Sequence, residues 1–333
     1  GAGGPGRGPA RGPVPERVVG AAGHLVHMPG HVYYRLGEYE KARRSFIASM
    51  RVDSTYMADQ RVPVSRVWNY VHNLNYLLAN CAEEGRYREG LEWARRLEEV
   101  PLVPRRPFFF YQGRMALPRL HMRFGSWSRA AGELAAIAAN DTVRDTFAGE
   151  YARAMEAFSL GMAHLGEGDV AAAGERLSQF PAPDDPGSSA GNDAYDAPRR
   201  RRLLNVARLD LRGNIHRARG EYELSFRTLG AAADSLEAIG YDEPPLYARP
   251  VLESLAQAHL EAGNRKQAAE LFEAVLARRP HSGFALYGLA QALDRGEDQE
   301  RAARAYGAFL ERWNGADQEL EAVRRARDRL ARH

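Results

Sequence analysis

Apolar residues recur at helical spacing along most of the chain, in paired runs that a short polar turn separates. In one such pair, Asn69–Ala82 and Glu89–Leu97 flank the turn residue Gly85. Apolar positions at i, i+3, i+4 and i+7 form one face of an amphipathic helix. The pattern therefore predicts a unit of two antiparallel helices joined at a glycine.

This unit recurs along the whole chain. After the glycine comes an aromatic or apolar residue two positions on, and then a small residue that lets the second helix approach the first. Glycine itself adopts the left-handed conformation that ends a helix. The turn glycines are Gly37, Gly85, Gly125, Gly168, Gly220, Gly263 and Gly296. We therefore expect an all-α solenoid of about seven helical hairpins.

The spacing of the copies predicts an irregular array. A regular array of this kind repeats about every 34 residues, and only the last pair of turn glycines comes close to that period. The longest interval contains a Pro- and Gly-rich stretch without periodicity, which predicts a flexible loop near residues 181–200. Residues 1–17 are rich in Gly, Pro and Arg and predict a disordered tail. The solenoid is expected to span residues 18–333.

The turn pattern resembles the tetratricopeptide repeat family. The first copy, LGEYEKARRSF, carries Gly37, Tyr39, Ala42 and Phe46 at that family's small and large positions. The sixth copy does so with Gly263, Ala268, Phe272 and the closing Pro280. The resemblance implies a right-handed superhelix whose concave groove binds a protein, a peptide or a small ligand.

A narrower resemblance rests on the segment AGHLVHMPGHVYYRLGEY and on the C-terminal stretch that begins YDEPPLYARPVLESLAQAHLEAGNRKQAAELF. Both resemble a bacterial subgroup of repeat proteins that carries a His-Met-Pro-x-His signature ahead of the Gly-x-Tyr turn. That subgroup has no settled activity, so the resemblance supports the fold and assigns no chemistry.

Three histidines stand close together in this segment, at i, i+3 and i+7. His24, His27 and His31 fall on one helical stripe, although Pro29 interrupts it and predicts a kink. The tetratricopeptide resemblance implies that positions 2, 5, 9 and 12 of each first helix line the concave groove. In the first two hairpins these and neighbouring groove positions hold His24, His27, His31, Tyr34, His72, Asn75 and Tyr76.

The histidines His24, His27, His31 and His72 are candidate ligands of one transition metal, copper, zinc or iron, because neutral imidazoles suit all three. No HExxH arrangement supplies a hydrolytic base. Two alternatives stay open: a histidine-lined groove that binds a partner without metal, and simple packing. The leading function is therefore a ligand-binding repeat scaffold that holds a metal, and the alternative is a metal-dependent oxidative enzyme.

Composition narrows the partners. The 46 basic and 43 acidic residues give a net charge of +3, and Arg and Glu are interspersed along the helices rather than gathered into a patch. This pattern disfavours nucleic acid as a partner. The sequence contains no phosphate-binding loop, so it predicts no nucleotide cofactor. The sequence has no apolar run long enough to span a membrane, so it predicts no membrane segment. It also has no secretory signal, and Cys81, the single cysteine, cannot form an intramolecular disulfide, so we expect a cytoplasmic location.

Overall fold

A computed structural model describes residues 16–101, 110–180, 197–240, 243–245, 247–294 and 298–332. All regular structure in these residues is helical, which confirms the all-α class. The predicted tail lies outside the described residues up to residue 15, and the first helix begins at Glu16. Residues 181–196 of the predicted loop also lie outside them. The last part of that loop was predicted wrongly, because residues 197–200 are the first turn of a helix.

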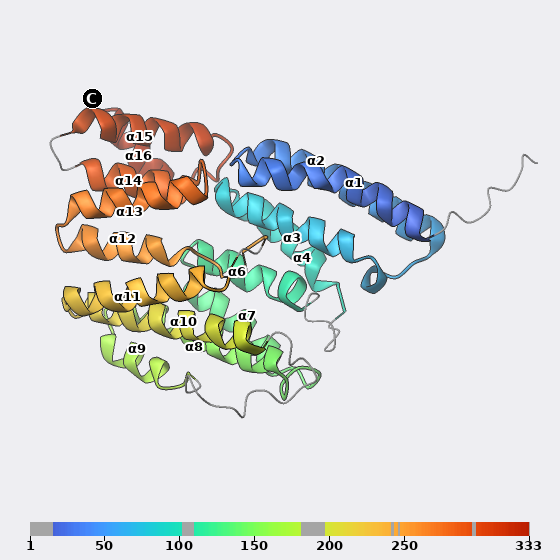
Figure 1. The fold of residues 1–333 in the computed structure, drawn as a ribbon, viewed down its shortest axis with the longest axis horizontal. Helices are drawn as coiled ribbons and strands as arrows, with labels where there is room; N and C mark the ends of the chain where they lie inside the picture. The colour runs from blue at the N-terminus through green and yellow to red at the C-terminus, as the bar shows by residue number, and fades with distance from the viewer. Residues whose placement is uncertain are drawn as a thin grey trace, which may run out of the picture.

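Seven hairpins follow one another along the described chain, each packed on the next (Figure 1). Their helices are α1 (Glu16–Arg35) with α2 (Tyr39–Gln60), α3 (Trp68–Glu83) with α4 (Tyr87–Glu98), α6 (Ala116–Arg123) with α7 (Trp127–Ala138), α8 (Phe147–Gly166) with α9 (Val170–Leu177), α10 (Ala197–Ala218) with α11 (Tyr222–Glu237), α12 (Val251–Glu261) with α13 (Arg265–Arg278), and α14 (Gly283–Asp294) with α15 (Gln299–Arg312). A final helix, α16 (Glu321–Leu330), packs on α15. Two short segments, the 3₁₀ turn η1 (Val64–Arg66) and the π-helical turn η2 (Phe110–Arg114), interrupt the succession.

The predicted left-handed glycine caps are confirmed at six turns. Gly37, for example, has φ +71°, and its amide donates to the carbonyl of Tyr34 while the next amide, of Glu38, donates to the carbonyl of Tyr33. These two hydrogen bonds form a Schellman motif. The same pair of bonds recurs after α3, α6, α8, α10 and α12. Gly296 lies outside the described residues.

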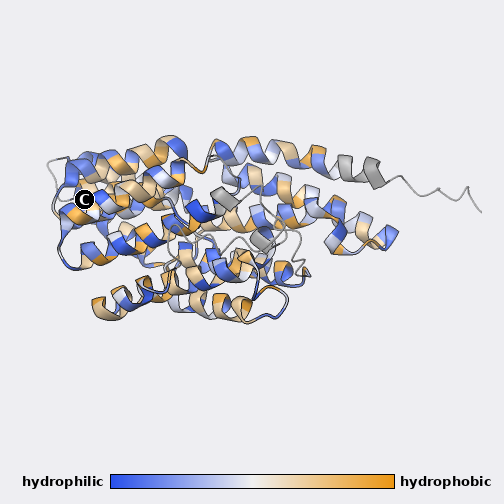
Figure 2. Ribbon diagram, turned by 60° about the horizontal axis from the view of Figure 1, so that its bottom comes forward, coloured by the Kyte–Doolittle hydropathy of each residue, from blue (hydrophilic) through white to orange (hydrophobic). Residues whose placement is uncertain are grey.

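Most of the buried residues in the described part of the chain are apolar, and hydrophobic and hydrophilic positions alternate along the helices (Figure 2). The small residues expected in the second helices are buried, as Ala42 shows, and the aromatic Phe46 is fully buried beside it. Cys81 is fully buried and belongs to the core, as predicted.

The array curls until its last hairpins touch its first turns (Figure 1). The indole of Trp313 donates to the carbonyl of Glu83 at 2.7 Å, and the amide of Asp317 donates to the carbonyl of Gly85 at 3.1 Å. A Cβ at Gly85 would lie 2.6 Å from the Trp313 ring, so glycine is required there for close approach as well as for the turn. Contacts between residues some 230 positions apart therefore make the solenoid a closed body.

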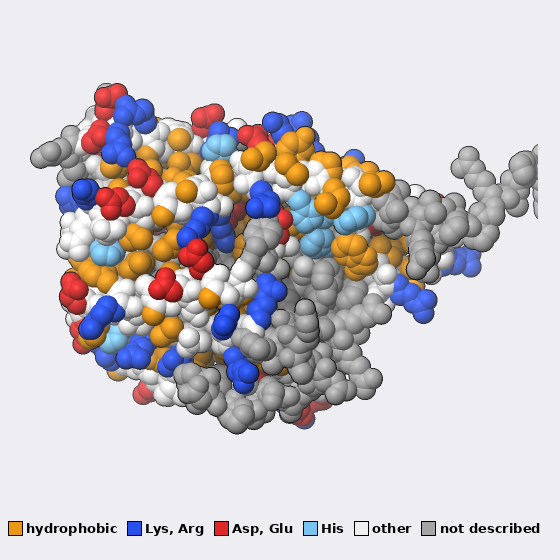
Figure 3. Space-filling model, viewed as in Figure 1, with side chains coloured by type: hydrophobic (Ala, Val, Ile, Leu, Met, Phe, Trp, Pro, Cys, Tyr) orange, Lys and Arg blue, Asp and Glu red, His pale blue; other side chains and the backbone are white. Residues whose placement is uncertain are grey.

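The two ends of the array differ in how they meet solvent. Helix α16 buries Val323 and Ala326 and is otherwise largely polar, as expected of a terminal cap. Helix α1 instead exposes a row of apolar side chains, which is visible in Figure 3. The row consists of Leu25, Met28, Val32 and Leu36. Met28 is 46% exposed and therefore does not fill the core.

Pro29 does not end α1, which continues from Glu16 to Arg35 as one helix. Pro29 is exposed on the outer face, so its ring does not disturb the packing of the inner face. In the described part of the chain, no helix has both the length and the apolar character needed to cross a membrane.

Candidate metal centre

Two glycines let α1 lie close enough to α2 to bury a histidine beneath it. A Cβ at Gly23 would lie 2.3 Å from Oδ1 of Asp53, and a Cβ at Gly30 would lie 2.5 Å from the Phe46 ring. Both distances are shorter than any van der Waals contact, so a larger residue would push the helices apart. His27 lies four residues after the first glycine and three before the second. Its side chain is therefore fully buried.

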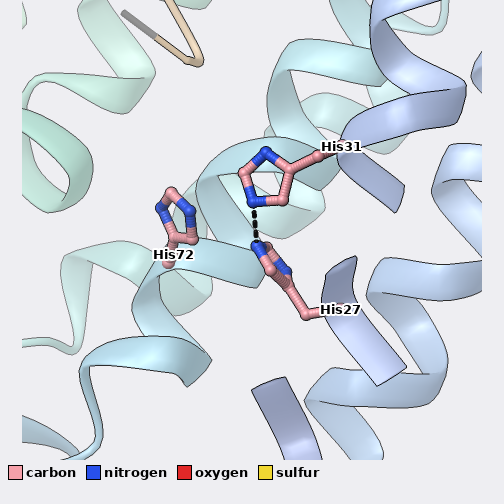
Figure 4. Close-up of side chains that lie close together, drawn as sticks. All are labelled: His27, His31 and His72. Carbon is pink, nitrogen blue, oxygen red and sulfur yellow. Dashed lines mark hydrogen bonds between the residues drawn. The ribbon is translucent and has the colours of Figure 1, made fainter. Parts of the chain in front are cut away.

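Three histidines meet at this point. His27 and His31 belong to α1, His72 belongs to α3, and one ring nitrogen of each lies within 4.8 Å of the others (Figure 4). The Nε2 atoms of His27 and His31 are 2.5 Å apart. His72 is 8% exposed, whereas the His31 side chain is 21% exposed and gives the group access to solvent. A group of histidine side chains is correspondingly visible beside the apolar row in Figure 3.

The amide of Asn73 decides which nitrogen of His27 carries the proton. Nδ2 of Asn73 donates to Oγ of Ser49 at 2.8 Å and to Oδ2 of Asp53 at 3.2 Å, so Oδ1 faces His27. Nδ1 of His27 lies 2.6 Å from that oxygen and must donate to it. Nε2 of His27 is therefore left with its lone pair, pointing at His31.

The other two histidines are held in the same way. Nδ1 of His31 lies 3.0 Å from Oε2 of Glu243 and 2.7 Å from the hydroxyl of Tyr76. Because a carboxylate only accepts, Nδ1 of His31 is the donor. Nδ1 of His72 lies 2.6 Å from Oε1 of Gln112. All three rings thus place Nδ1 against an oxygen atom, and Nε2 of His27 accepts a hydrogen bond from Nε2 of His31.

This arrangement places ring nitrogens of the three histidines close to one another. Burial lowers the pKa of His27 to about 3 and that of His72 to about 4, so both rings are neutral near pH 7. The 2.5 Å contact between the Nε2 atoms of His27 and His31 is a hydrogen bond, so a proton lies between these nitrogens, and a metal ion bound by both would take the place of that proton.

A metal ion with nitrogen ligands fits this donor set. Zinc binds histidine at about 2.0–2.1 Å, and three histidines with one open position are a known catalytic zinc arrangement. Histidine ligands commonly donate their second nitrogen to a carboxylate or a carbonyl oxygen, as all three do here. His27, His31 and His72 are the residues that would hold the ion, and Asn73, Glu243 and Gln112 would orient them.

His24, the fourth predicted ligand, is outside the group. Its ring centroid is 5.9 Å from that of His27 and 5.5 Å from that of Trp68, which stands at the start of α3. At this level of α1 the facing helix presents an indole rather than a ligand nitrogen. The pair that does meet, His27 with His31, has the i, i+4 spacing that brings side chains together on a helix.

The predicted groove residues Tyr34, Asn75 and Tyr76 occupy different environments. Tyr34 lines a cavity of about 620 Å³ and, together with Asn75, a second one of about 50 Å³. Nδ2 of Asn75 is buried and has no hydrogen-bond partner in the structure. Tyr76 is fully buried beneath the histidines and does not face an open groove, because its hydroxyl reaches His31.

Sequence reasoning missed the three residues that orient the histidines. Gln112 belongs to the π-helical turn η2, and such turns are frequent at functional sites, but nothing in the sequence marks one. Glu243 is 212 residues from His31 and comes from the connection between α11 and α12. The only signal there is the pair Pro244 and Pro245 that follows it. Asn73 could have been suspected as the neighbour of His72.

Comparisons with known proteins bear on the fold. The tetratricopeptide repeat family profile matches residues 251–282 and 284–313, which contain α12 to α15. A tetratricopeptide repeat protein from Parabacteroides merdae has a solved structure that is 12% identical, with 93% of this chain and 99% of that chain covered and a TM-score of 0.41. The APC/C hetero-tetramer Cut9–Hcn1 is 12% identical, with 84% of this chain and 52% of that chain covered and a TM-score of 0.39. No curated protein matches the sequence.

The fold and the site together define an all-α repeat protein with a three-histidine cluster in its first two hairpins. Its sixth and seventh hairpins match the tetratricopeptide repeat, and this is the region where the turn glycines have the regular spacing. The narrower resemblance to the His-Met-Pro-x-His subgroup stays a prediction, as does the cytoplasmic location.

Proposed function

We propose that this protein is a repeat scaffold that binds one transition-metal ion through His27, His31 and His72. The observation that carries the proposal is the shared orientation of the three rings: each Nδ1 meets an oxygen acceptor, and the remaining nitrogens converge. A cluster that served packing alone would not need three separate polar groups to hold Nδ1 of each ring.

Zinc and copper are the ions best suited to this set of ligands. Three neutral imidazoles without a thiolate match the preference of Zn²⁺ and Cu²⁺, while the thioether of Met28 faces solvent and adds no soft ligand. A tetrahedral ion would keep its fourth position open toward the exposed edge of His31, where water or a group of a bound partner would complete the coordination. The oxidative enzyme that the sequence raised as an alternative stays a prediction.

The array itself supports the second part of the proposal, which is a protein, peptide or small ligand on the inner face of the solenoid. Stacked helical hairpins create extended concave surfaces that repeat proteins use for binding. Tyr34 lies at the end of α1 that faces the inside of the array, one turn from His31. The metal and a ligand would therefore share one region of the scaffold.

Metal-dependent stabilisation tests the proposal. The full chain, stripped with a chelator, is melted with and without a small excess of Zn²⁺ or Cu²⁺. Because the ion binds only the folded site, saturation at about 100 times Kd adds about 2.7 kcal/mol to the free energy of unfolding and raises Tm by several degrees.

The His27→Ala variant should lose this gain, and a second buried histidine provides the matched control. His121 is 5% exposed and contacts Tyr87 rather than another histidine. The His121→Ala variant should therefore keep the full metal-dependent rise in Tm. Equal behaviour of the two variants, or a wild type whose Tm ignores both ions, would contradict the proposal.

A further inference from the structure

A second site adjoins the histidines on the side of Glu243. A cavity of about 620 Å³ lies between the first turn of the array and hairpins five and six. This volume falls within the range of small-molecule sites, which is about 300–1,000 Å³. Most of the wall is apolar and is contributed by Leu236, Ile239, Pro245, Val251, Leu252 and Val275.

The charged residues on this wall differ in whether they have partners. Arg278 donates to both oxygens of Glu237, at 2.9 and 3.1 Å, and Arg279 pairs with Glu83 at 3.4 Å. Arg35 lies at the exposed rim. Arg278 and Arg279 are therefore neutralised within the protein.

Glu243 is the exception on the wall. Its side chain is 10% exposed, and its one ion-pair partner among the described residues is His31. Oε1 of Glu243 is buried and accepts no hydrogen bond in the structure. A buried carboxylate oxygen left in this state costs free energy that a ligand with a positively charged donor would recover. The cavity therefore combines an apolar body with one anionic acceptor.

We infer that this cavity binds a primary alkylamine, whose ammonium group donates to Oε1 of Glu243 and whose hydrocarbon chain lies against the apolar wall. Tyr247 also lines the cavity. Its hydroxyl already donates to Oδ2 of Asp210 at 2.9 Å, so its proton is not available to a ligand. Charge separates an amine from an alcohol or a carboxylate of the same length: the carboxylate is repelled by Glu243, and the alcohol gains only a neutral donor's bond.

Calorimetric titration of the chelator-stripped full chain with octylamine, octanol and octanoate tests the inference. Because the protein contains no metal in this experiment, the result is independent of the metal proposal. Octylamine should bind one site per chain about tenfold more tightly than octanol, since a hydrogen bond to a charged group exceeds a neutral one. Octanoate should bind more weakly than either.

Two variants and one control locate the site. Glu243→Gln keeps the shape of the side chain and should reduce octylamine affinity about tenfold while leaving octanol unchanged. Ala277→Trp fills the cavity from the end of α13 and should abolish binding of both. Glu237→Gln alters an acid on the same wall that Arg278 already satisfies, and it should bind octylamine as the wild type does. Circular dichroism checks that each variant is folded.

The inference is overturned if octylamine fails to bind the wild type, if octanol or octanoate binds as tightly, or if Glu243→Gln retains full octylamine affinity. Binding that survives in Ala277→Trp would also overturn it, because the ligand would then lie elsewhere.

Discussion

The histidine cluster and the charged cluster at the closure of the array both consist of polar side chains buried in an apolar solenoid. They differ in the partners that these buried side chains have. At the closure, Arg123 donates to both oxygens of Glu253, at 2.5 and 3.0 Å, and lies 3.6 Å from Glu83. Ser282 donates to the other oxygen of Glu83 at 2.8 Å. Cationic donors face carboxylate acceptors in this cluster, whereas in the histidine cluster ring nitrogens face one another.

The electrostatics of the two clusters reflect this difference. Burial alone would raise the pKa of Glu253, but the guanidinium of Arg123 lowers it below its usual value. The charges at the closure therefore stabilise one another and need nothing from outside the chain. Burial lowers the pKa of His27 and of His72, and the ring nitrogens of the three histidines lie close together at the point where we propose a metal ion. The first arrangement is structural, and the second is the one that we propose as a binding site.

Removal of Arg123 should give the largest effect on stability. Arg123→Ala leaves Glu253 buried without the guanidinium that donates to both of its oxygens, which costs about 3–5 kcal/mol of unfolding free energy. Arg301→Ala, which breaks an exposed pair with Glu273, should cost less than about 1 kcal/mol. Urea unfolding followed by circular dichroism compares the two. Similar losses would show that the closure is not held by its charges.

Glu84 sharpens the comparison because it is a carboxylate near the closure that is poorly neutralised. Burial raises its pKa to about 7 from an unfolded value near 4.5, and Oε2 has no hydrogen-bond partner. The folded chain then holds this proton more tightly than the unfolded chain. Its contribution to stability is complete below pH 4.5 and is lost as the pH rises through about 7.

The Glu84→Gln variant should abolish this pH dependence. At pH 8 it should be more stable than the wild type by up to about 3 kcal/mol, and near pH 4 the two should be equally stable. Denaturant unfolding at both pH values measures the difference. A variant that is less stable than the wild type at pH 8 would show that the Glu84 carboxylate is stabilised by its arginine neighbours.

In the histidine cluster, substitution of Gln112 should change the metal affinity more than the free energy of unfolding. It holds Nδ1 of His72 and is only partly buried, so Gln112→Leu removes an orienting contact without opening the core. Loss of such a contact typically lowers metal affinity about 10–100-fold. Competition with a chromogenic chelator measures the change. An unchanged affinity would mean that the ring of His72 is positioned by packing alone.

Substitution of His24 should have the smallest effect of these variants on metal affinity. It stacks on His27 but contributes no nitrogen to the convergent group, so His24→Ala should change metal affinity by less than about twofold. The same titration measures this variant. A tenfold loss would return His24 to the ligand set that the sequence predicted.

The hairpins could be predicted because each rests on local rules. A glycine with positive φ follows the first helix of six hairpins in the described part of the chain, and a small residue in the second helix permits close packing, as Gly37 and Ala42 show. The closure of the array could not be predicted, since the contact of Trp313 with Gly85 depends on curvature accumulated over every hairpin between them. The irregular spacing of the turns hides that curvature from the sequence.

The candidate site shows the same division. His27 and His31 share a helix, and His72 follows from the repeat frame, so their meeting could be inferred. The exclusion of His24 depends on which residue of α3 stands opposite it. Glu243 reaches His31 from a connection more than 200 residues away, and no local pattern encodes such a contact.

Titration of the stripped chain with Co²⁺ tests the three-histidine metal centre most directly, because the visible absorption of the ion reports its coordination. The wild type and His24→Ala should each bind one ion per chain with the intense bands of a four- or five-coordinate site, and His27→Ala, with an unchanged helical spectrum, should show none. Bands of equal intensity in His27→Ala, or no bands in the wild type, would contradict the account.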